Sequence, residues 1–160
     1  MNGHMKPADI EKRSFAIITE ELGGRTFPDG VAEVVKRVIH TSADFDYADN
    51  LCFSPDAVEQ AKAALEAGAT IVTDTNMALA GISKPTLAKL GGKAVCLMAD
   101  EDVAREARTR GVTRATVSME HAAKLDGPLI FAIGNAPTAL IRLHELIGEG
   151  AVSPALVIGV

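Results

Sequence analysis

The sequence predicts an α/β fold: a single doubly wound, mostly parallel sheet with helices on both faces, in three layers. Two patterns point to it. Four short runs in the second half of the chain are apolar throughout, as strands buried on both faces are. Segments whose apolar residues recur at helical spacing separate these runs. With 160 residues, 48% of them hydrophobic, the chain is long and apolar enough for the core that such a sheet needs.

The first part of the chain predicts helices, with one short strand among them. Proline and glycine mark where these elements begin and end. In order, we expect a helix over 10–22 that ends at Gly23-Gly24, a helix over 31–39 after Pro28, a polar loop over 44–50, a short edge strand over 51–53, and a helix over 56–67 that Ser54-Pro55 precedes and Gly68 closes.

The second part predicts the sheet. We expect strands over 69–73, 94–98, 129–133 and 155–158, with a segment over 85–90, a helix over 101–110 stopped by Gly111 and a helix over 137–147 stopped by Gly148 between them. No linker rich in Pro, Gly or Ser divides this pattern, so residues 8–160 are expected to form one Rossmann-like domain. Residues 1–7, which include Gly3-His4-Met5, are expected to be a disordered remnant of cloning.

Composition excludes several classes of protein. Sixteen basic against 21 acidic side chains give a net charge of −5, which provides no field for a phosphate backbone. Aromatic residues make up only 4% of the chain, too few for stacking on single-stranded nucleic acid. No run reaches the ~20 apolar residues that span a bilayer. These features predict a soluble, cytoplasmic protein without a membrane or nucleic-acid partner. Cys52 and Cys96 have no paired spacing and are interpreted as small buried hydrophobes.

Common catalytic motifs are absent from the sequence. There is no G-x-G-x-x-G after a strand, no phosphate-binding loop of the G-x-x-x-x-G-K-[ST] type, and no G-x-S-x-G. His144-Glu145 lacks a second histidine four residues on, so it does not form a zinc-protease helix. His121 and His144 lie on amphipathic helices, where a surface or hydrogen-bonded position is the interpretation we favour. No metal site is predicted.

Polar residues follow three of the predicted strands, where ligands of such sheets bind. Asp74 to Met77 follow the first strand, Asp100 to Asp102 follow the second, and Gly134 to Thr138 follow the third. The free amides at the helix start after Asn135 predict an anion site. The alternative is a tight turn between strand and helix.

His40 is the other candidate. It lies at the end of a predicted helix that carries Arg37 one turn earlier, so both side chains can face one space. Histidine is suited to donating a proton near neutral pH. The alternative is a histidine that only interacts with the dipole at the helix C-terminus.

Taken together, five stretches resemble the precorrin-8X methylmutase family of cobalamin (vitamin B12) biosynthesis, including its cobalt-precorrin-8 members. The resemblance covers essentially the whole chain and keeps the family's order. Its stretches are Ile10 to Ile18 (IEKRSFAII), Arg37 to His40 (RVIH), Phe53-Ser54-Pro55 with 63–69 (AALEAGA), Asp74 with Met77 and Gly81, and Ile133 to Leu140 (IGNAPTAL) with Pro154 to Gly159 (PALVIG).

The resemblance implies an isomerase without a cofactor, which moves a methyl group from C-11 to C-12 of precorrin-8X or cobalt-precorrin-8. The product is hydrogenobyrinic acid or cobyrinic acid. His40 matches the residue regarded as the proton donor to the ring C nitrogen. A homodimer with its pocket near the subunit interface is also implied. Substrate contacts are expected from the other site residues, which are Ser14, Arg37, Asp74, Met77, Arg114 and Asn135.

Two departures from the family are visible. Asn76 and 78–80 loosen the match after Asp74. Family members continue past the final strand, so the chain is expected to lack the family's C-terminal segment. A non-catalytic corrinoid-binding or tetrapyrrole-binding protein that keeps the pocket therefore stays an alternative. A generic nucleotide-binding sheet protein is the third hypothesis.

Overall fold

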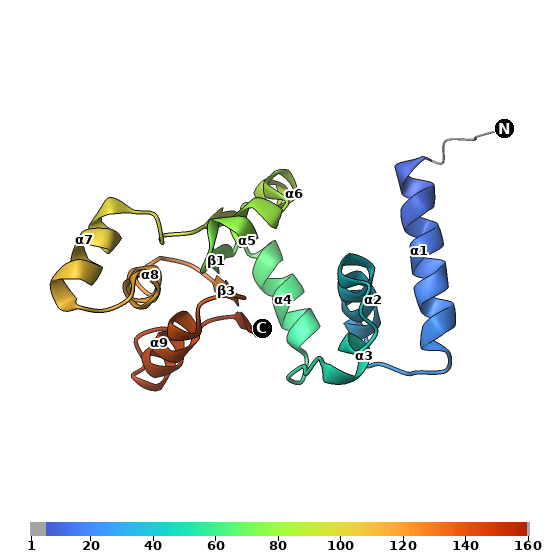
Figure 1. The fold of residues 1–160 in the computed structure, drawn as a ribbon. Coiled ribbons are helices and arrows are strands. Elements are labelled where there is room, and N and C mark those ends of the chain that lie inside the picture. The colour runs from blue at the N-terminus through green and yellow to red at the C-terminus, as the bar shows by residue number, and fades with distance from the viewer. Residues whose placement is uncertain (1–5, 160) are drawn as a thin grey trace. The chain divides into compact units, whose positions relative to one another are not determined.

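The computed structural model describes residues 6–159 of the chain. The expected cloning remnant Gly3-His4-Met5 lies outside these residues. The contacts divide the chain into two compact units, one up to Val58 and one from Glu59. We call them the helical unit and the sheet unit, and describe each by itself (Figure 1).

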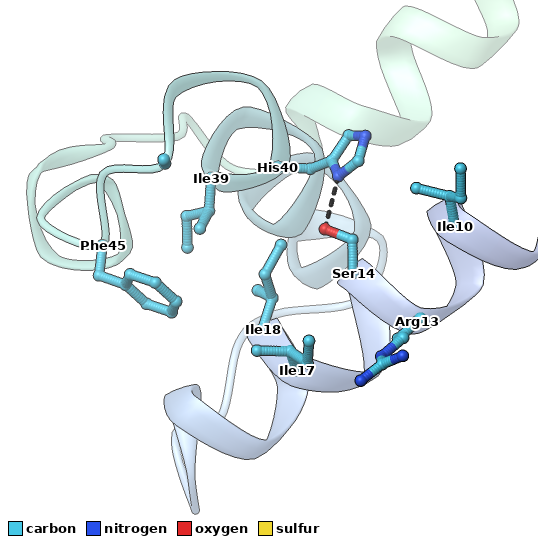
Figure 2. Close-up of a pocket in the computed structure, with 9 residues that line it drawn as sticks. Ile10, Arg13, Ser14, Ile17, Ile18, Ile39, His40 and Phe45 are labelled. Carbon is cyan, nitrogen blue, oxygen red and sulfur yellow. Dashed lines mark hydrogen bonds between the residues drawn. The ribbon is translucent and has the colours of Figure 1, made fainter. Parts of the chain in front are cut away.

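The helical unit is built from two long helices and one short one: α1 (Pro7–Leu22), α2 (Val31–Ser42) and α3 (Tyr47–Asn50). As predicted, α1 ends at Gly23. Ile18 and Leu22 of α1 bury their side chains against Val35 and Ile39 of α2. Figure 2 shows Ile18 and Ile39 pointing toward one another between the two helices. The apolar stripes that predicted these helices therefore form their contact surface.

Two predictions for this unit were wrong. The expected polar loop over 44–50 contains α3. The expected edge strand over 51–53 is not a strand, because Leu51 and Phe53 pack against the core between α1 and α2 instead of pairing with a backbone. A short apolar run predicts burial but does not distinguish a strand from an irregular segment that lies on helices.

The sheet unit contains four strands, all parallel, in the order β2-β1-β3-β4. The strands are β1 (Thr70–Thr73), β2 (Lys93–Val95), β3 (Leu129–Ile133) and β4 (Leu156–Gly159). β2 is shorter than the predicted run over 94–98. Chain order reverses direction between β1 and β3, because β2 is added on one side of β1 and β3 on the other.

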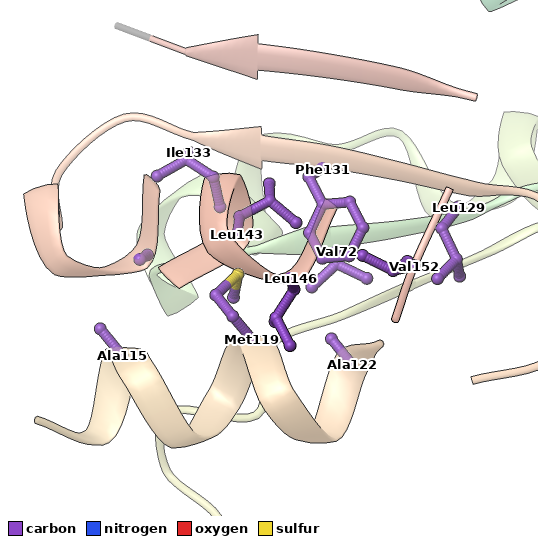
Figure 3. Close-up of a cluster of buried hydrophobic side chains, with 11 residues drawn as sticks. Val72, Ala115, Met119, Ala122, Leu129, Phe131, Ile133, Leu143, Leu146 and Val152 are labelled. Atoms are coloured by element: carbon purple, nitrogen blue, oxygen red, sulfur yellow. The ribbon is translucent and has the colours of Figure 1, made fainter. Parts of the chain in front are cut away.

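Helices cover both faces of this sheet, as the sequence predicted. On one face Val72, Phe131 and Ile133 pack against Met119 and Leu143 (Figure 3). On the other, Ile71 and Ile130 pack against Ala64. Every second residue of a strand thus faces the same helices. The helices are α4 (Ala57–Glu66), α5 (Asn76–Gly81), α6 (Lys84–Lys89), α7 (Glu101–Arg110), α8 (Arg114–Ala122) and α9 (Pro137–Gly148).

Two of these helices begin with threonine caps that the sequence analysis did not use. The Thr75 hydroxyl accepts a hydrogen bond from the Ala78 amide, and Thr113 does the same for the Thr116 amide. The first cap starts α5 among the polar residues that follow the first predicted strand. The second starts α8, for which the sequence predicted only an amphipathic helix around His121. A threonine at this position stabilises a helix start by about 1 kcal/mol.

Glycine is required at the turn into β2. A Cβ atom on Gly92 would lie 2.7 Å from the Ala69 carbonyl oxygen and 2.8 Å from a Leu87 methyl group. Gly68, which closes α4, has a φ of +78°, a conformation that side chains disfavour. The two glycines let the ends of α4 and α6 meet the sheet closely.

An ion-pair network joins α7, α8 and α9. Glu120 of α8 accepts hydrogen bonds from Arg110 and, at 2.9 Å, from Arg142. Arg110 also binds Glu106 at 2.6 Å, and Glu106 binds His121 at 2.9 Å. The hydrogen bond from Arg110, followed by that from Arg142, lowers the pKa of Glu120 against an opposing effect of burial. Bonds from His121 and Arg110 lower the pKa of Glu106.

Within residues 6–159, no helix combines the length and the apolar character that crossing a bilayer requires.

The lowered pKa of Glu120 predicts acid sensitivity of the sheet unit. A carboxylate whose pKa is lower in the folded chain contributes stability above the ordinary value of 4.5, and this contribution is lost as the pH falls through the folded pKa. Glu120→Gln is expected to cost about 1 kcal/mol at pH 7 and to flatten the decline of stability below pH ~4.5. Urea unfolding at several pH values measures both.

The control is Glu66→Gln, at an exposed glutamate of α4 that has no ion-pair partner in the described part of the chain. This substitution should leave the pH dependence of the free energy of unfolding as in the wild type. Equal slopes for Glu120→Gln and the wild type would contradict a stabilising role for the network.

Candidate active site

His40 lies in the last turn of α2, half-buried, with its ring directed toward α1. Its Nδ1 atom is 2.8 Å from the Ser14 hydroxyl, although the two residues are 26 positions apart (Figure 2). Its Nε2 atom has no hydrogen-bond partner among residues 6–159. One ring nitrogen is thus held by the protein, and the other is available to a ligand.

Phe15 joins His40 and Arg37. The phenyl and imidazole rings stack with centroids 5.3 Å apart and planes 28° apart. The Arg37 guanidinium carbon lies 4.7 Å from the centre of the same phenyl ring, and its Nη1 atom binds the Glu11 carboxylate at 2.6 Å. Arg37 and His40 therefore share one space, as their spacing predicted. The favourable contact of a cation with an aromatic face helps to hold both side chains against α1.

The simpler interpretation of His40, as a residue that only interacts with the end of its helix, is incomplete. The backbone amide of Ala43 binds the Ile39 carbonyl at this end. The His40 ring instead makes its hydrogen bond to a side chain of another helix. The position of His40 in the last turn of α2 is therefore only part of its environment.

A pocket of about 410 Å³ opens beside this pair of side chains. Its walls are mainly apolar and come from α1, from the end of α2 and from Phe45. Ile10 and Ile17 are about half exposed, at 53% and 49%, so the apolar wall is accessible to a ligand. The residues that line the pocket are Ile10, Arg13, Ser14, Ile17, Ile18, Ile39, His40, Ala43 and Phe45. Such a surface suits a large apolar ligand with a few polar contacts.

In the sheet unit, Asp74 is placed where the strand order reverses. It follows β1 and is only 1% exposed. Its carboxylate accepts three backbone hydrogen bonds from the loop after β3, from Asn135 and Ala136 at 2.7 Å and from Gly134 at 3.3 Å. The Ala136 amide belongs to the helix start that was expected to form an anion site for a ligand. The structure corrects the expectation for this amide, because Asp74 already binds it.

The remaining predicted site residues of the sheet unit are exposed. Met77 lies on α5 with 84% of its surface exposed, and Asn135 is held through its backbone. Arg114 begins α8. A hydrogen bond of 3.0 Å from Thr113 to Thr138 ties the starts of α8 and α9 together. Asp74 and Asn135 are thus in direct contact, whereas the side chains of Met77 and Arg114 make no hydrogen bond to either within the described residues.

The structure therefore groups the predicted residues into two sets, with Ser14, Arg37 and His40 in the helical unit and the others in the sheet unit. Sequence reasoning missed Glu11 and Phe15 as partners of Arg37 and Arg13 as a pocket residue. The available signal was their position on α1, since Glu11 lies three residues before Ser14 and the other two are its neighbours.

Other chemistry-bearing residues are already satisfied or isolated. His121 is bound to Glu106, in line with the hydrogen-bonded position favoured from the sequence. Among residues 6–159, no group of three or more His, Cys, Asp or Glu side chains is arranged to hold a metal ion. Cys52 is exposed rather than buried, and Cys96 is half-buried.

Comparison with known proteins identifies the family. The model of the precorrin-8X methylmutase family matches residues 9–160. A cobalt-precorrin-8 methylmutase of Priestia megaterium is 44% identical over 97% of this chain and 69% of its own length. The corresponding protein of Salmonella typhimurium is 45% identical over 88% of this chain and 70% of its own.

A relative named precorrin-8X methylmutase and a solved structure are similar too. A precorrin-8X methylmutase of Pseudomonas aeruginosa is 38% identical over 94% of this chain and 72% of its own. The crystal structure of precorrin-8x methyl mutase from Thermus thermophilus has a TM-score of 0.84 and 39% identity, and the match covers 96% of this chain and 75% of that one. The α/β fold predicted from the sequence is thereby confirmed.

The buried Asp74 carboxylate predicts a strong effect on stability. Asp74→Asn replaces one of the two accepting carboxylate oxygens by an NH₂ group. This group turns an N–H toward at least one of the backbone amides that Asp74 binds. A loss of about 2–3 kcal/mol is expected, since bonds to a charged acceptor are lost and a buried amide is left unpaired. Urea unfolding followed by circular dichroism measures it.

Asp100→Asn provides the matched control. Asp100 follows β2 and is exposed, and its side chain makes no hydrogen bond within the described residues. This substitution should change stability by less than about 0.5 kcal/mol. If Asp74→Asn were equally mild, the three amides would not depend on the carboxylate.

Proposed function

The chain belongs to the precorrin-8X methylmutase family, and we propose that it is an isomerase of cobalamin biosynthesis. It moves a methyl group from C-11 to C-12 of precorrin-8X or cobalt-precorrin-8, which gives hydrogenobyrinic acid or cobyrinic acid. The observation that carries the assignment of roles is the hydrogen bond between Ser14 and His40 at the apolar pocket.

The pocket of the helical unit fits one part of such a substrate. A corrinoid is a broad, largely apolar ring system with carboxylate arms. Ile10, Ile17 and Phe45 offer exposed apolar surface to the ring. A rearrangement inside one bound molecule needs a held substrate and a placed proton rather than a nucleophile.

His40 acts as the proton donor. In the charged ring, Nδ1–H donates to the Ser14 hydroxyl and Nε2–H faces the substrate. Transfer of the Nε2 proton to the ring C nitrogen withdraws electrons from the neighbouring carbon, and the methyl group migrates. The product is an isomer of the substrate, so the proton is released again after the shift.

The other residues hold the substrate or the residues that contact it. Ser14 orients His40. Arg37, Met77, Arg114 and Asn135 are proposed as substrate contacts. For Asp74, the hydrogen bonds to the loop after β3 support a role in shaping the loop that carries Asn135.

We also propose that the protein works as a homodimer in the cytoplasm, with the corrinoid as its small-molecule partner. The net charge of −5 and the low aromatic content support the absence of a nucleic-acid partner.

His40→Ala is the decisive substitution. Because a placed general acid contributes about 10²–10⁴-fold, kcat should fall by at least 100-fold while the product still binds. The assay follows conversion of precorrin-8X and of cobalt-precorrin-8 by absorbance, and a separate titration with hydrogenobyrinic acid measures binding. Ser14→Ala, which removes one neutral hydrogen bond, should lower kcat by about tenfold.

His144→Ala is the matched control, since His144 is an exposed histidine of α9 without a hydrogen-bond partner in the described part. It should retain full activity. If the wild-type protein bound hydrogenobyrinic acid but converted neither substrate, the chain would be the non-catalytic corrinoid-binding protein. A lack of binding as well would exclude both functions.

A further inference from the structure

Arg13 lines the same pocket as Ser14 and His40, from the neighbouring position on α1. In the view of Figure 2, Arg13 lies below Ser14 and the His40 ring lies above it. The side chain of Arg13 is exposed to solvent. A guanidinium group with several donors is therefore placed at the wall of a pocket whose other surface is mostly apolar.

The charge of Arg13 is not compensated within the described residues. Three arginines belong to the helical unit. Arg25 pairs with Asp49 at 2.6 Å, and Arg37 pairs with Glu11 at 2.6 Å. Arg13 alone among them has no ion pair in the part of the chain that the structure describes. The pocket also contains no carboxylate among its lining residues.

We infer that Arg13 binds a carboxylate arm of the corrinoid and thereby sets the position of the ring relative to His40. This inference rests on the proposed function. Arg37, which was the arginine expected here from the sequence, already has a carboxylate in Glu11 and an aromatic face in Phe15. Arg13 can offer paired N–H donors to a carboxylate without breaking an existing contact.

The chemistry gives this contact a distinct kinetic signature. The carboxylate arms do not react, so their charge is the same in the bound substrate and in the transition state. An interaction with such a group strengthens binding of both states alike and leaves kcat nearly unchanged. Loss of Arg13 should therefore raise KM and the Kd of the product, whereas loss of His40 lowers kcat.

The test compares Arg13→Gln with Lys12→Gln, which removes one positive charge from the adjacent position of α1 outside the pocket. For Arg13→Gln, KM for the substrate and Kd for hydrogenobyrinic acid should rise about tenfold, with kcat within twofold of the wild type. Lys12→Gln should change neither by more than twofold. Circular dichroism spectra confirm that both variants are folded.

A second titration identifies the group that Arg13 binds. The probe is the same corrinoid with its carboxylate arms converted to methyl esters. If Arg13 holds a carboxylate, the tenfold difference between wild type and Arg13→Gln should disappear with the ester. An unchanged difference, or an equal Kd of the two proteins for hydrogenobyrinic acid, would overturn the role of Arg13 while the methylmutase function stood. If the wild-type protein neither bound nor converted a corrinoid, both proposals would fail.

Discussion

The end of the sheet where the strand order reverses depends on one buried carboxylate. Parallel sheets leave a crevice at this point, between the carboxyl ends of strands that continue in opposite directions. In this chain Asp74 reaches from β1 to the loop after β3 and accepts its amides. The bonds fix the start of α9, to which α8 is tied by Thr113 and Thr138. These hydrogen bonds therefore hold the backbone that carries the exposed residues at this end of the sheet.

In the helical unit, the His40 imidazole ring is held between helices rather than at the end of a sheet. The Ser14 hydroxyl binds the ring, the Phe15 ring stacks on it, and Arg37 beside it forms an ion pair with Glu11. The pocket beside them keeps an apolar wall that is about half exposed, because Ile10 and Ile17 lie outside the core between α1 and α2.

The sequence predicted the strands, most helix ends and the common space of Arg37 and His40, because hydrophobic period, glycine stops and helical spacing are local signals. It missed α3 and misplaced a strand at 51–53, where burial comes from packing on other helices. The partner of Asp74 lies 60 residues away and that of His40 lies 26 residues away, so neither bond is visible in a local pattern. For the same reason the sequence predicted free amides at the helix start after Asn135. In the structure, the carboxylate of Asp74 already binds there. The assignment of roles to individual residues stays a prediction.

The Ser14 hydroxyl has a consequence for repeated use of His40. In the proposed transfer the Nε2 proton leaves and Nδ1–H stays on the ring, so the Ser14 oxygen accepts from Nδ1–H before and after the step, at an unchanged distance between the heavy atoms. A carboxylate in this place would add a negative charge beside the ring, whereas the serine adds none. In the function that we propose, Nε2 can be reprotonated from solvent with the Ser14 contact and the two helices left in place.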